Sequence, residues 1–372
     1  MLADQTADLD RLRATDRLRR LIPQAGRDFS SNDYLALACS PLLAEAACAA
    51  IARGVPVGSG GSRLLRGNHA EHEVLEEEAA RFFGSEAALF FSTGYAANSA
   101  LLSTLPQRGD LILHDELVHA SAHEGMRLSR ASARSVLHND VDAVEAALRE
   151  WRGNGGTGTA WIVVESIYSM DGDRAPLADL AEVARRHDAM LLVDEAHATG
   201  VFGPDGRGLV GDMARGANII TLHTLGKGLG CEGALLCGPR IMRDFLVNRG
   251  RAFIFSTAPS PLTAAVARAS LAAMPKAGGL RDELWDLVQH AQTLLAPMGV
   301  RSTGSQILPL ILGDDCRTMA AAAALQDAGF DVRGIRPPTV PEGTSRLRIS
   351  ITRNVSKDDL IALADALGGL VP

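Results

Sequence analysis

The sequence predicts an α/β protein built on a mostly parallel sheet, with a smaller α+β domain towards the C-terminus. Short apolar runs alternate with helix-type patterns through the middle of the chain, which is typical of parallel strands joined by helices. After about residue 260 the sequence pattern changes, and it predicts Ala- and Leu-rich helices followed by further apolar runs. The 372 residues are enough for two to three domains, or for one large α/β domain with appendages.

Six strands are expected in order along the middle of the chain, each a short apolar run. They span residues 86–91, 110–114, 160–165, 189–194, 218–223 and 233–238. Between the third and fourth runs, four residues have the i, i+3, i+4, i+7 spacing of one helix face: Leu177, Leu180, Ala181 and Ala184. Ligands of parallel sheets bind at the carboxyl ends of the strands, so the residues after each run are candidate site residues.

The chain is expected to divide into three parts. Residues 1–45 form an N-terminal helix and extended segment, residues 46–260 the large domain, and residues 261–372 the C-terminal α+β domain. In the last part, helices are expected at 261–274, 281–297 and 316–328.

The composition excludes several classes of protein. A net charge of −7 and a pI near 5.8 argue against a dedicated nucleic-acid binder. No run of about 18 apolar residues occurs, so no transmembrane helix is expected. The N-terminal residues lack the apolar core of a secretory signal, and the five cysteines are scattered without a CxxC pair. The expected location is the cytoplasm, without disulfides or a metal site.

Three sequence motifs resemble nucleotide-binding sites, but each lacks a residue or a companion motif that such a site needs. GSGGSR (58–63) has Arg63 where a dinucleotide loop needs its third glycine. LGKGLG has Gly228 where a P-loop needs Ser or Thr. Without a P-loop, the DEAH string that begins at Asp194 does not indicate a nucleotide-driven helicase.

A carboxylate and a lysine form a more coherent pair. Asp194 ends an apolar run, and Lys227 follows one further helix and strand later, between Gly226 and Gly228. Pyridoxal 5′-phosphate (PLP) needs a Schiff-base lysine and an acidic partner for its pyridinium nitrogen. Taken singly, Asp194 also suits a structural cap or ion pair, and Lys227 suits a surface turn.

Neighbouring segments supply the rest of a PLP site. FSTGYAAN (91–98) joins a strand to a helix, where backbone N–H groups bind phosphate. His119 offers a ring that could stack on the cofactor, although a capping or surface role suits it equally well.

Motifs of one known family run nearly from end to end of the chain: SSNDYLALA (30–38), GSGGSR (58–63), STGYAAN (92–98), VHASAHEG (118–125), SMDGDRAPL (169–177), VDEAHATGVFG (193–203), TLGKGLG (224–230) and IRPPTVPEGTSRLR (335–348). By these motifs the chain resembles the α-oxoamine synthases, which are PLP-dependent acyltransferases of fold type I. The resemblance implies a large domain with a mostly parallel seven-stranded sheet.

Within that family the last motif favours the branch that condenses L-alanine with a pimeloyl thioester in biotin synthesis. The thioester carrier could be coenzyme A or acyl carrier protein. The alternative is a glycine-using relative, such as a glycine C-acetyltransferase or a 5-aminolevulinate synthase.

The resemblance also implies roles for individual residues. Lys227 would form the Schiff base, Asp194 would pair with the pyridinium nitrogen, His197 would bind the ring hydroxyl, and His119 would stack on the ring. Further residues would line the cofactor pocket or hold the phosphate: Glu165, Ser169, Gly94, Tyr95, Thr224 and, from a partner subunit, Thr257.

Three residues match positions that bind substrate carboxylates: Asn32, Arg19 and Arg348. Arg348 is the better anchor, because a planar guanidinium binds a carboxylate through two hydrogen bonds. Sites completed by Thr257 of a second subunit imply a homodimer with shared active sites.

A few positions depart from the family pattern. Ala36 replaces a usual glycine, and Cys231 and Glu232 stand where small or hydroxyl residues are common. An acidic acyl carrier protein would bind to a basic patch on the enzyme. The candidates for such a patch are Arg63, Arg66, Arg243, Arg249 and Arg251, which could instead be ordinary solvated surface charges.

Overall fold

The computed structural model describes residues 2–216 and 218–370, which divide into two compact units. The large unit comprises Leu35–Tyr168 and Arg174–Gly279. The small unit comprises the chain up to Tyr34, the short segment Ser169–Asp173, and the chain from Leu280 onward. The domain boundaries expected after residues 45 and 260 stay a prediction.

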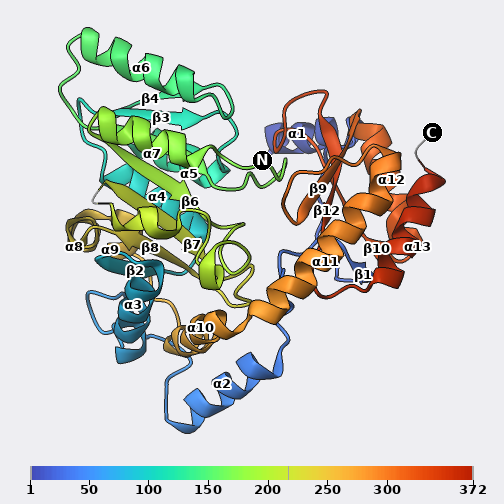
Figure 1. Ribbon diagram of the computed structural model, residues 1–372, viewed down its shortest axis with the longest axis horizontal. Coiled ribbons are helices and arrows are strands. Elements are labelled where there is room, and N and C mark those ends of the chain that lie inside the picture. The colour runs from blue at the N-terminus through green and yellow to red at the C-terminus, as the bar shows by residue number, and fades with distance from the viewer. Residues whose placement is uncertain (1, 217, 371–372) are drawn as a thin grey trace. The chain divides into compact units, whose positions relative to one another are not determined.

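The large unit is built on one seven-stranded sheet (Figure 1). Its strands, in spatial order, are β2 (Ala87–Phe91), β8 (Ala234–Gly238), β7 (Ile219–Thr224), β6 (Ala189–Asp194), β5 (Ala160–Glu165), β3 (Leu111–Asp115) and β4 (Ser132–Val136). β8 runs antiparallel to both of its neighbours, β2 and β7, and the other neighbouring pairs of strands are parallel. The predicted mostly parallel sheet is therefore confirmed, as are the six predicted strands.

The edge strand β4 was missed by the sequence prediction. Its residues, SARSV, are all exposed except Val136, so the segment contains no apolar run. A strand paired on one side only needs less apolar surface than a central strand, and the periodicity of the sequence does not reveal it.

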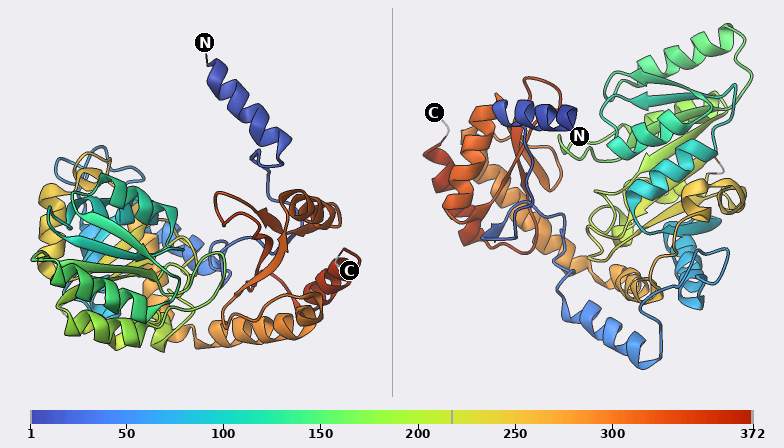
Figure 2. Two further views of the ribbon diagram at one scale, coloured as in Figure 1. Left: turned by 90° about the horizontal axis from the view of Figure 1, so that it is seen from above. Right: turned by 180° about the vertical axis from the view of Figure 1, so that it is seen from behind.

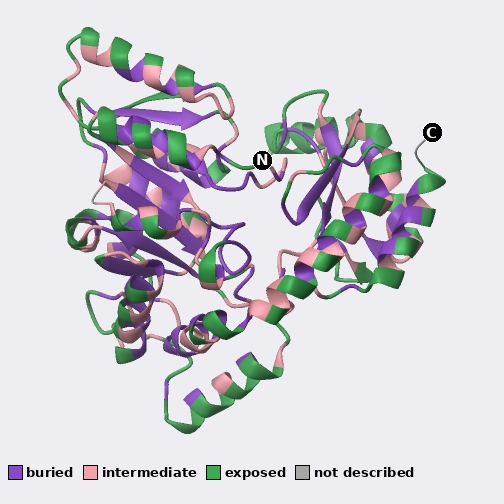
Figure 3. Cartoon of the chain, viewed as in Figure 1, coloured by how far each residue is buried: buried purple, intermediate pink, exposed green. Residues whose placement is uncertain are grey.

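Both faces of the sheet are buried. Leu111, Leu113 and Ile162 pack into one apolar cluster, whereas the alternating residues Ile112 and Trp161 pack into a second. The alternation follows from the period of two along a strand, and Figure 3 shows the strands buried while the helices expose their outer sides.

Helices cover these two faces. The first cluster includes side chains of α6 (Val141–Gly153) and α7 (Leu177–Arg186), and the second those of α4 (Gly94–Thr104), α5 (Ala120–Leu128) and α8 (Arg240–Arg249). The remaining helices of the large unit are α2 (Pro41–Ala52), α3 (Ala70–Phe83), α9 (Arg251–Ile254) and α10 (Pro261–Ala273), with short 3₁₀ turns at Pro204–Gly206, Gly211–Arg215 and Met274–Lys276.

The small unit is α+β, as predicted. Its three-stranded antiparallel sheet has the order β11 (Arg333–Ile335), β12 (Ser345–Ser350), β9 (Ile307–Gly313), and β1 (Arg27–Asp28) pairs in parallel with β10 (Phe330–Asp331). Its helices are α1 (Ala3–Ala14), α12 (Asp315–Asp327) and α13 (Lys357–Gly368), while α11 (Gly278–Leu295) begins in the large unit and a 3₁₀ turn follows at Ala296–Met298. Helix α1 has no buried residue, and Figure 2 shows it projecting from this unit.

Candidate active site

The candidate residues of the large unit lie at the carboxyl ends of its parallel strands. Glu165 ends β5 and Asp194 ends β6, and the two are directly paired in the sheet. Thr224 ends β7, three residues before Lys227. Since neighbouring parallel strands end at the same edge, the fold brings these side chains together as the sequence predicted.

Lys227 and His197 are in direct contact. The lysine Nζ lies 2.8 Å from Nε2 of the histidine. The turn that carries Lys227 packs against the turn after β6 so closely that a Cβ on Gly228 would lie 2.5 Å from the carbonyl oxygen of Thr199. Glycine at 228 is therefore required by this close approach, which fixes the lysine beside His197.

The carboxylate of Asp194 is held at both oxygens. Oδ1 accepts a hydrogen bond from the backbone N–H of Ala196 at 3.0 Å, and Oδ2 accepts one from Nδ2 of Asn98 at 2.8 Å. Asn98 is a buried residue of α4. These two hydrogen bonds fix the orientation of the Asp194 carboxylate at the end of β6.

Asn98 also connects Asp194 with His119. Its Nδ2 donates to Oγ of Ser121 at 3.0 Å, and Ser121 Oγ lies 2.8 Å from Nδ1 of His119. The backbone N–H of Ser121 also donates to this Nδ1, at 3.2 Å. A backbone N–H can only donate, so Nδ1 is an acceptor and the neutral ring carries its proton on Nε2.

The pKa of His119 is lowered, mainly because the ring is buried. The charge of Asp194 raises this pKa and the charge of Lys227 lowers it further. His119, Asp194 and Lys227 are therefore within electrostatic reach of one another, and the ring is neutral near pH 7.

The start of α4 forms a candidate phosphate cradle. Thr93 caps the helix by accepting a hydrogen bond from the N–H of Ala96 at 3.0 Å. A Cβ on Gly94, the first helical residue, would lie 3.9 Å from Oγ1 of Thr224. The predicted phosphate residues Gly94 and Thr224 are thus neighbours, and Tyr95 is half exposed at the same helix end. A helix N-terminus of this kind favours an anion.

Together these residues fit PLP. The site offers an amine at Lys227, a carboxylate at Asp194, a ring at His119, a hydrogen-bonding imidazole at His197 and an anion cradle at Gly94. Each matches one chemical group of the cofactor.

Thr257 is exposed on a segment that hydrogen bonds tie to other parts of the large unit. Ser59 Oγ donates to the carbonyl oxygen of Ala258 at 2.8 Å, and Nε2 of the buried His72 donates to that of Pro259, also at 2.8 Å. The N–H of Ala258 in turn donates to the carbonyl oxygen of Gly61 at 2.8 Å.

The small unit gathers three of the predicted residues. Arg348 of β12 is buried; its Nη2 donates to Oδ1 of Asn32 at 3.1 Å and its Nε donates to the carbonyl oxygen of Ser169 at 2.6 Å. Arg19 is exposed, and its Nη2 donates to Oγ1 of Thr339 at 3.1 Å.

Glu195 is a further buried residue that the sequence analysis did not single out. Its carboxylate accepts hydrogen bonds from Oγ of Ser166 at 2.7 Å and from the backbone N–H groups of Leu209 and Val210 at 3.1 and 2.6 Å. Burial raises its pKa. A Cβ on Gly208, which has a φ of +98°, would collide with this carboxylate at 2.7 Å, so the loop wraps directly around Glu195.

Residues 2–216 and 218–370 contain no group of three or more His, Cys, Asp or Glu side chains placed to bind a metal. No helix among them is both long enough and apolar enough to cross a membrane.

Residues 26–367 match the family described as aminotransferase class I and II. The 8-amino-7-oxononanoate synthase of Citrifermentans bemidjiense is 45% identical over 327 residues, covering 86% of this chain and 82% of the relative. The Burkholderia mallei (strain SAVP1) protein of the same name is 45% identical over 348 residues, covering 91% and 87%.

Two solved structures are similar in fold to this chain over most of its length. Serine palmitoyltransferase from S. paucimobilis, with bound PLP–myriocin aldimine, has a TM-score of 0.90 at 27% identity and covers 99% of this chain and 97% of its own. The 8-amino-7-oxononanoate synthase from Francisella tularensis has a TM-score of 0.77 at 26% identity, covering 92% and 97%.

Proposed function

Because the chain belongs to the aminotransferase class I and II family, and within it to the 8-amino-7-oxononanoate synthases, we propose that it joins L-alanine to a pimeloyl thioester, with loss of CO₂ and of the thiol carrier. It is a PLP-dependent acyltransferase of fold type I. The product, 8-amino-7-oxononanoate, places the enzyme in biotin synthesis.

One observation carries this proposal: Lys227, His197, Asp194 and His119 converge at the carboxyl ends of the parallel strands. When bound, PLP supplies an electron sink for the α-carbon of the amino acid. The residues of the chain have to hold the cofactor, orient the substrate and move one proton.

Lys227 Nζ is the proposed general base that takes the α-proton of alanine, oriented by the contact with His197 at 2.8 Å. Asp194 would hold the proton on the ring nitrogen of the cofactor, and the hydrogen bonds from Asn98 and Ala196 keep its carboxylate in place. The neutral ring of His119 would stack on the cofactor without adding a positive charge beside Lys227.

The remaining predicted residues bind groups away from the reacting carbon. Gly94, Tyr95 and Thr224 hold the phosphate, helped by Thr257 from a second subunit. Glu165 and Ser169 line the pocket, and Arg348 with Asn32 binds the amino-acid carboxylate. Arg19, which is exposed and donates a hydrogen bond to Thr339, is the third residue proposed to bind a substrate carboxylate.

We propose that the enzyme works as a homodimer in the cytoplasm and takes its acyl group from coenzyme A or acyl carrier protein. The test is product formation by the purified holoenzyme supplied with L-alanine and pimeloyl-CoA, followed by mass spectrometry. We expect the condensation product with alanine and at least about tenfold less turnover with glycine, which differs by one methyl group. A preference for glycine, or turnover that persists in Lys227→Ala, would refute the assignment.

A further inference from the structure

Strand β12 carries two buried arginines on one face of its sheet. Arg346 is 3% exposed and Arg348 is 6% exposed, while Leu347 between them lies on the opposite face. The Cα atoms of the two arginines are roughly 7 Å apart, because each residue of a strand adds about 3.3 Å. An unpaired buried charge is costly, so each guanidinium needs either a partner in the protein or a ligand.

The charge of Arg346 is compensated by a carboxylate. Its Nη1 lies 2.5 Å from Oδ1 of Asp171, and Nη1 also donates to the carbonyl oxygen of Met170 at 3.4 Å. Its Nε donates to the carbonyl oxygen of Thr344 at 2.9 Å. A guanidinium that already has an acidic partner is poorly suited to bind the carboxylate of a substrate.

The bonds of Arg348 are of a different kind, because its three nitrogen atoms all donate to neutral groups. Nε donates to the carbonyl oxygen of Ser169 at 2.6 Å, Nη1 to Oγ of Ser350 at 2.7 Å and Nη2 to Oδ1 of Asn32 at 3.1 Å. Among residues 2–216 and 218–370, no carboxylate lies within 4 Å of this guanidinium. Its position is fixed while its charge stays available for an anionic ligand.

Both arginines bind the same short segment, Ser169–Asp173, which belongs to the small unit. Arg348 binds its first residue, through the carbonyl oxygen of Ser169, and Arg346 binds the side chain of Asp171 two residues later. The ion pair of Arg346 therefore holds in place the segment whose carbonyl group orients Arg348.

A glycine presses this segment against strand β9. Gly172 has a φ of +74°, and a Cβ on it would lie 2.4 Å from the carbonyl oxygen of Ile307, the first residue of β9. No side chain fits there, so the segment lies directly on the sheet that carries both arginines. Without the bond to Asp171, the part of the segment between Ser169 and Gly172 would lose its side-chain anchor.

We propose that Arg346, through its ion pair with Asp171, is a positioning residue for substrate binding. It would hold the Ser169 carbonyl against Nε of Arg348. The ion pair would also neutralise a second guanidinium roughly 7 Å away, which would otherwise compete for the substrate carboxylate. This inference rests on the proposed function, because it takes Arg348 as the anchor of the amino-acid carboxylate.

The test compares the binding of L-alanine with that of L-alaninamide, which has the same amine and methyl group but no carboxylate. Each is titrated into holoenzyme without an acyl donor, and the absorbance of bound PLP reports the Kd. Asp171→Asn removes the charge and keeps the shape of the side chain. We expect it to raise the Kd for L-alanine about tenfold or more, because a displacement of about 1 Å can have an effect of this size. The Kd for L-alaninamide should stay unchanged.

Two further variants separate positioning from general damage. Asp171→Glu keeps a carboxylate and should restore the binding of L-alanine. Asp286→Asn breaks an exposed ion pair with Lys357, 2.7 Å long and also within the small unit, and should change neither Kd. Both Kd values come from one preparation, so a loss of folded protein does not alter their ratio.

The inference is overturned if the ratio of the two Kd values is the same in Asp171→Asn as in the wild type, or if Asp286→Asn changes it as much. A structural disturbance of the cofactor site would weaken both ligands equally and leave this ratio unchanged. Arg348→Gln tests the premise, since it should raise the same ratio. If Arg348→Gln leaves the ratio unchanged, Arg348 is not the carboxylate anchor, and that part of the proposed function fails together with the inference.

Discussion

Both carboxylate oxygens of Asp194 already accept hydrogen bonds, from Asn98 and from the backbone of Ala196. An acid held in this way can stabilise a proton on the cofactor ring, whereas an amide at the same position cannot. We therefore expect Asp194→Asn to lower kcat by about 10³-fold, which corresponds to about 4 kcal/mol in the barrier. Steady-state rates with alanine measure this, and a loss of less than tenfold would show that Asp194 is not the partner of the ring nitrogen.

Asn98 permits a finer test of the same residue. Asn98→Ala removes the hydrogen bond to Asp194 Oδ2 and the link to Ser121, but it leaves the carboxylate in place. The expected loss is about 10- to 100-fold in kcat, the size of effect that follows removal of a residue that orients a metal ligand. The pH midpoint of the visible absorbance of bound PLP should shift as well. An unchanged midpoint would indicate a purely structural role, and Asn248→Ala on the exposed side of α8 is the control.

At the scale of single residues, the sequence predicted the cofactor groups better than their supports. Asp194, Lys227 and His119 could be found because the chemistry of PLP demands an acid, an amine and a ring. Asn98 and Ser121 lie within the quoted motifs, but their role depends on how α4 packs against α5, and spacing along the chain does not report it. Glu195 was missed for the same reason, because its partners lie in a loop that follows it.

At the scale of elements, one buried ion pair fixes the loop between α2 and α3. Arg63 donates to both carboxylate oxygens of Glu76 in α3, at 2.9 and 3.2 Å, and to Asn68. Removing one partner leaves the other charge buried, so Arg63→Ala should lower the free energy of unfolding by about 3–5 kcal/mol. Chemical denaturation measures it. Arg53→Ala, at a more exposed pair with Glu71, should cost less than about 1 kcal/mol, and equal losses would contradict this explanation.

The contact between His72 of α3 and the segment that carries Thr257 should make the stability of the fold depend on pH. Burial, followed by the charge of Arg63, lowers the pKa of His72 to about 4 from its ordinary value of 6.5. The folded pKa is below the unfolded one, so the stabilisation is complete above pH 6.5 and is lost as pH falls towards 4. We expect the free energy of unfolding to fall by about 3 kcal/mol as the pH is lowered from 6.5 to 4. Unfolding measured at several pH values should show a shallower dependence in His72→Gln, and an equally steep one would contradict this assignment.

The elements themselves were largely predictable where they are apolar. The central strands are buried on both faces and appear in the sequence as continuous apolar runs. The edge strand β4 could not be found, because its exposed residues carry no such pattern.

At the scale of the whole molecule, the proposed homodimer can be tested through Thr257. This residue is exposed close in sequence to Phe255, which is itself 71% exposed, and a threonine that binds phosphate across an interface has to be presented in this way. We expect little activity from Lys227→Ala or Thr257→Ala alone, and recovery of about a quarter of wild-type activity when the two are refolded together, because each hybrid dimer has one intact site. Light scattering checks the dimer mass, and absence of recovery would place Thr257 in its own subunit's site or outside any site.

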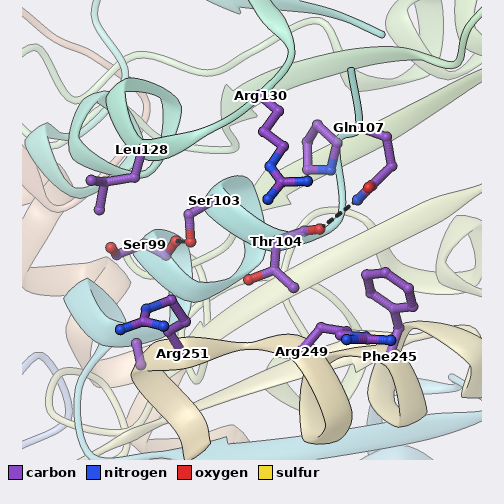
Figure 4. A pocket seen from close by; sticks show the side chains of 11 residues that line it. Ser99, Ser103, Thr104, Gln107, Leu128, Arg130, Phe245, Arg249 and Arg251 are labelled. Atoms are coloured by element: carbon purple, nitrogen blue, oxygen red, sulfur yellow. Dashed lines mark hydrogen bonds between the residues drawn. The ribbon is translucent and has the colours of Figure 1, made fainter. Parts of the chain in front are cut away.

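The fold class could be predicted because it follows from the order of strands and helices along the chain. The pocket beside α4 (Figure 4) could not, since its lining residues come from three segments that are far apart in the sequence, 99–107, 128–130 and 245–252, and that meet only in the folded unit.

The hydrogen-bonded chain from His119 through Ser121 and Asn98 to Asp194 also has a consequence in the cell. It joins three separate elements, so the cofactor can be gripped only after the large unit has folded, and binding in turn stabilises that folded state. A shortage of vitamin B6 would therefore have two effects on this enzyme. Molecules without the cofactor would be inactive, and they would also be degraded faster, because the protein without bound cofactor unfolds more often and is then cleaved by proteases.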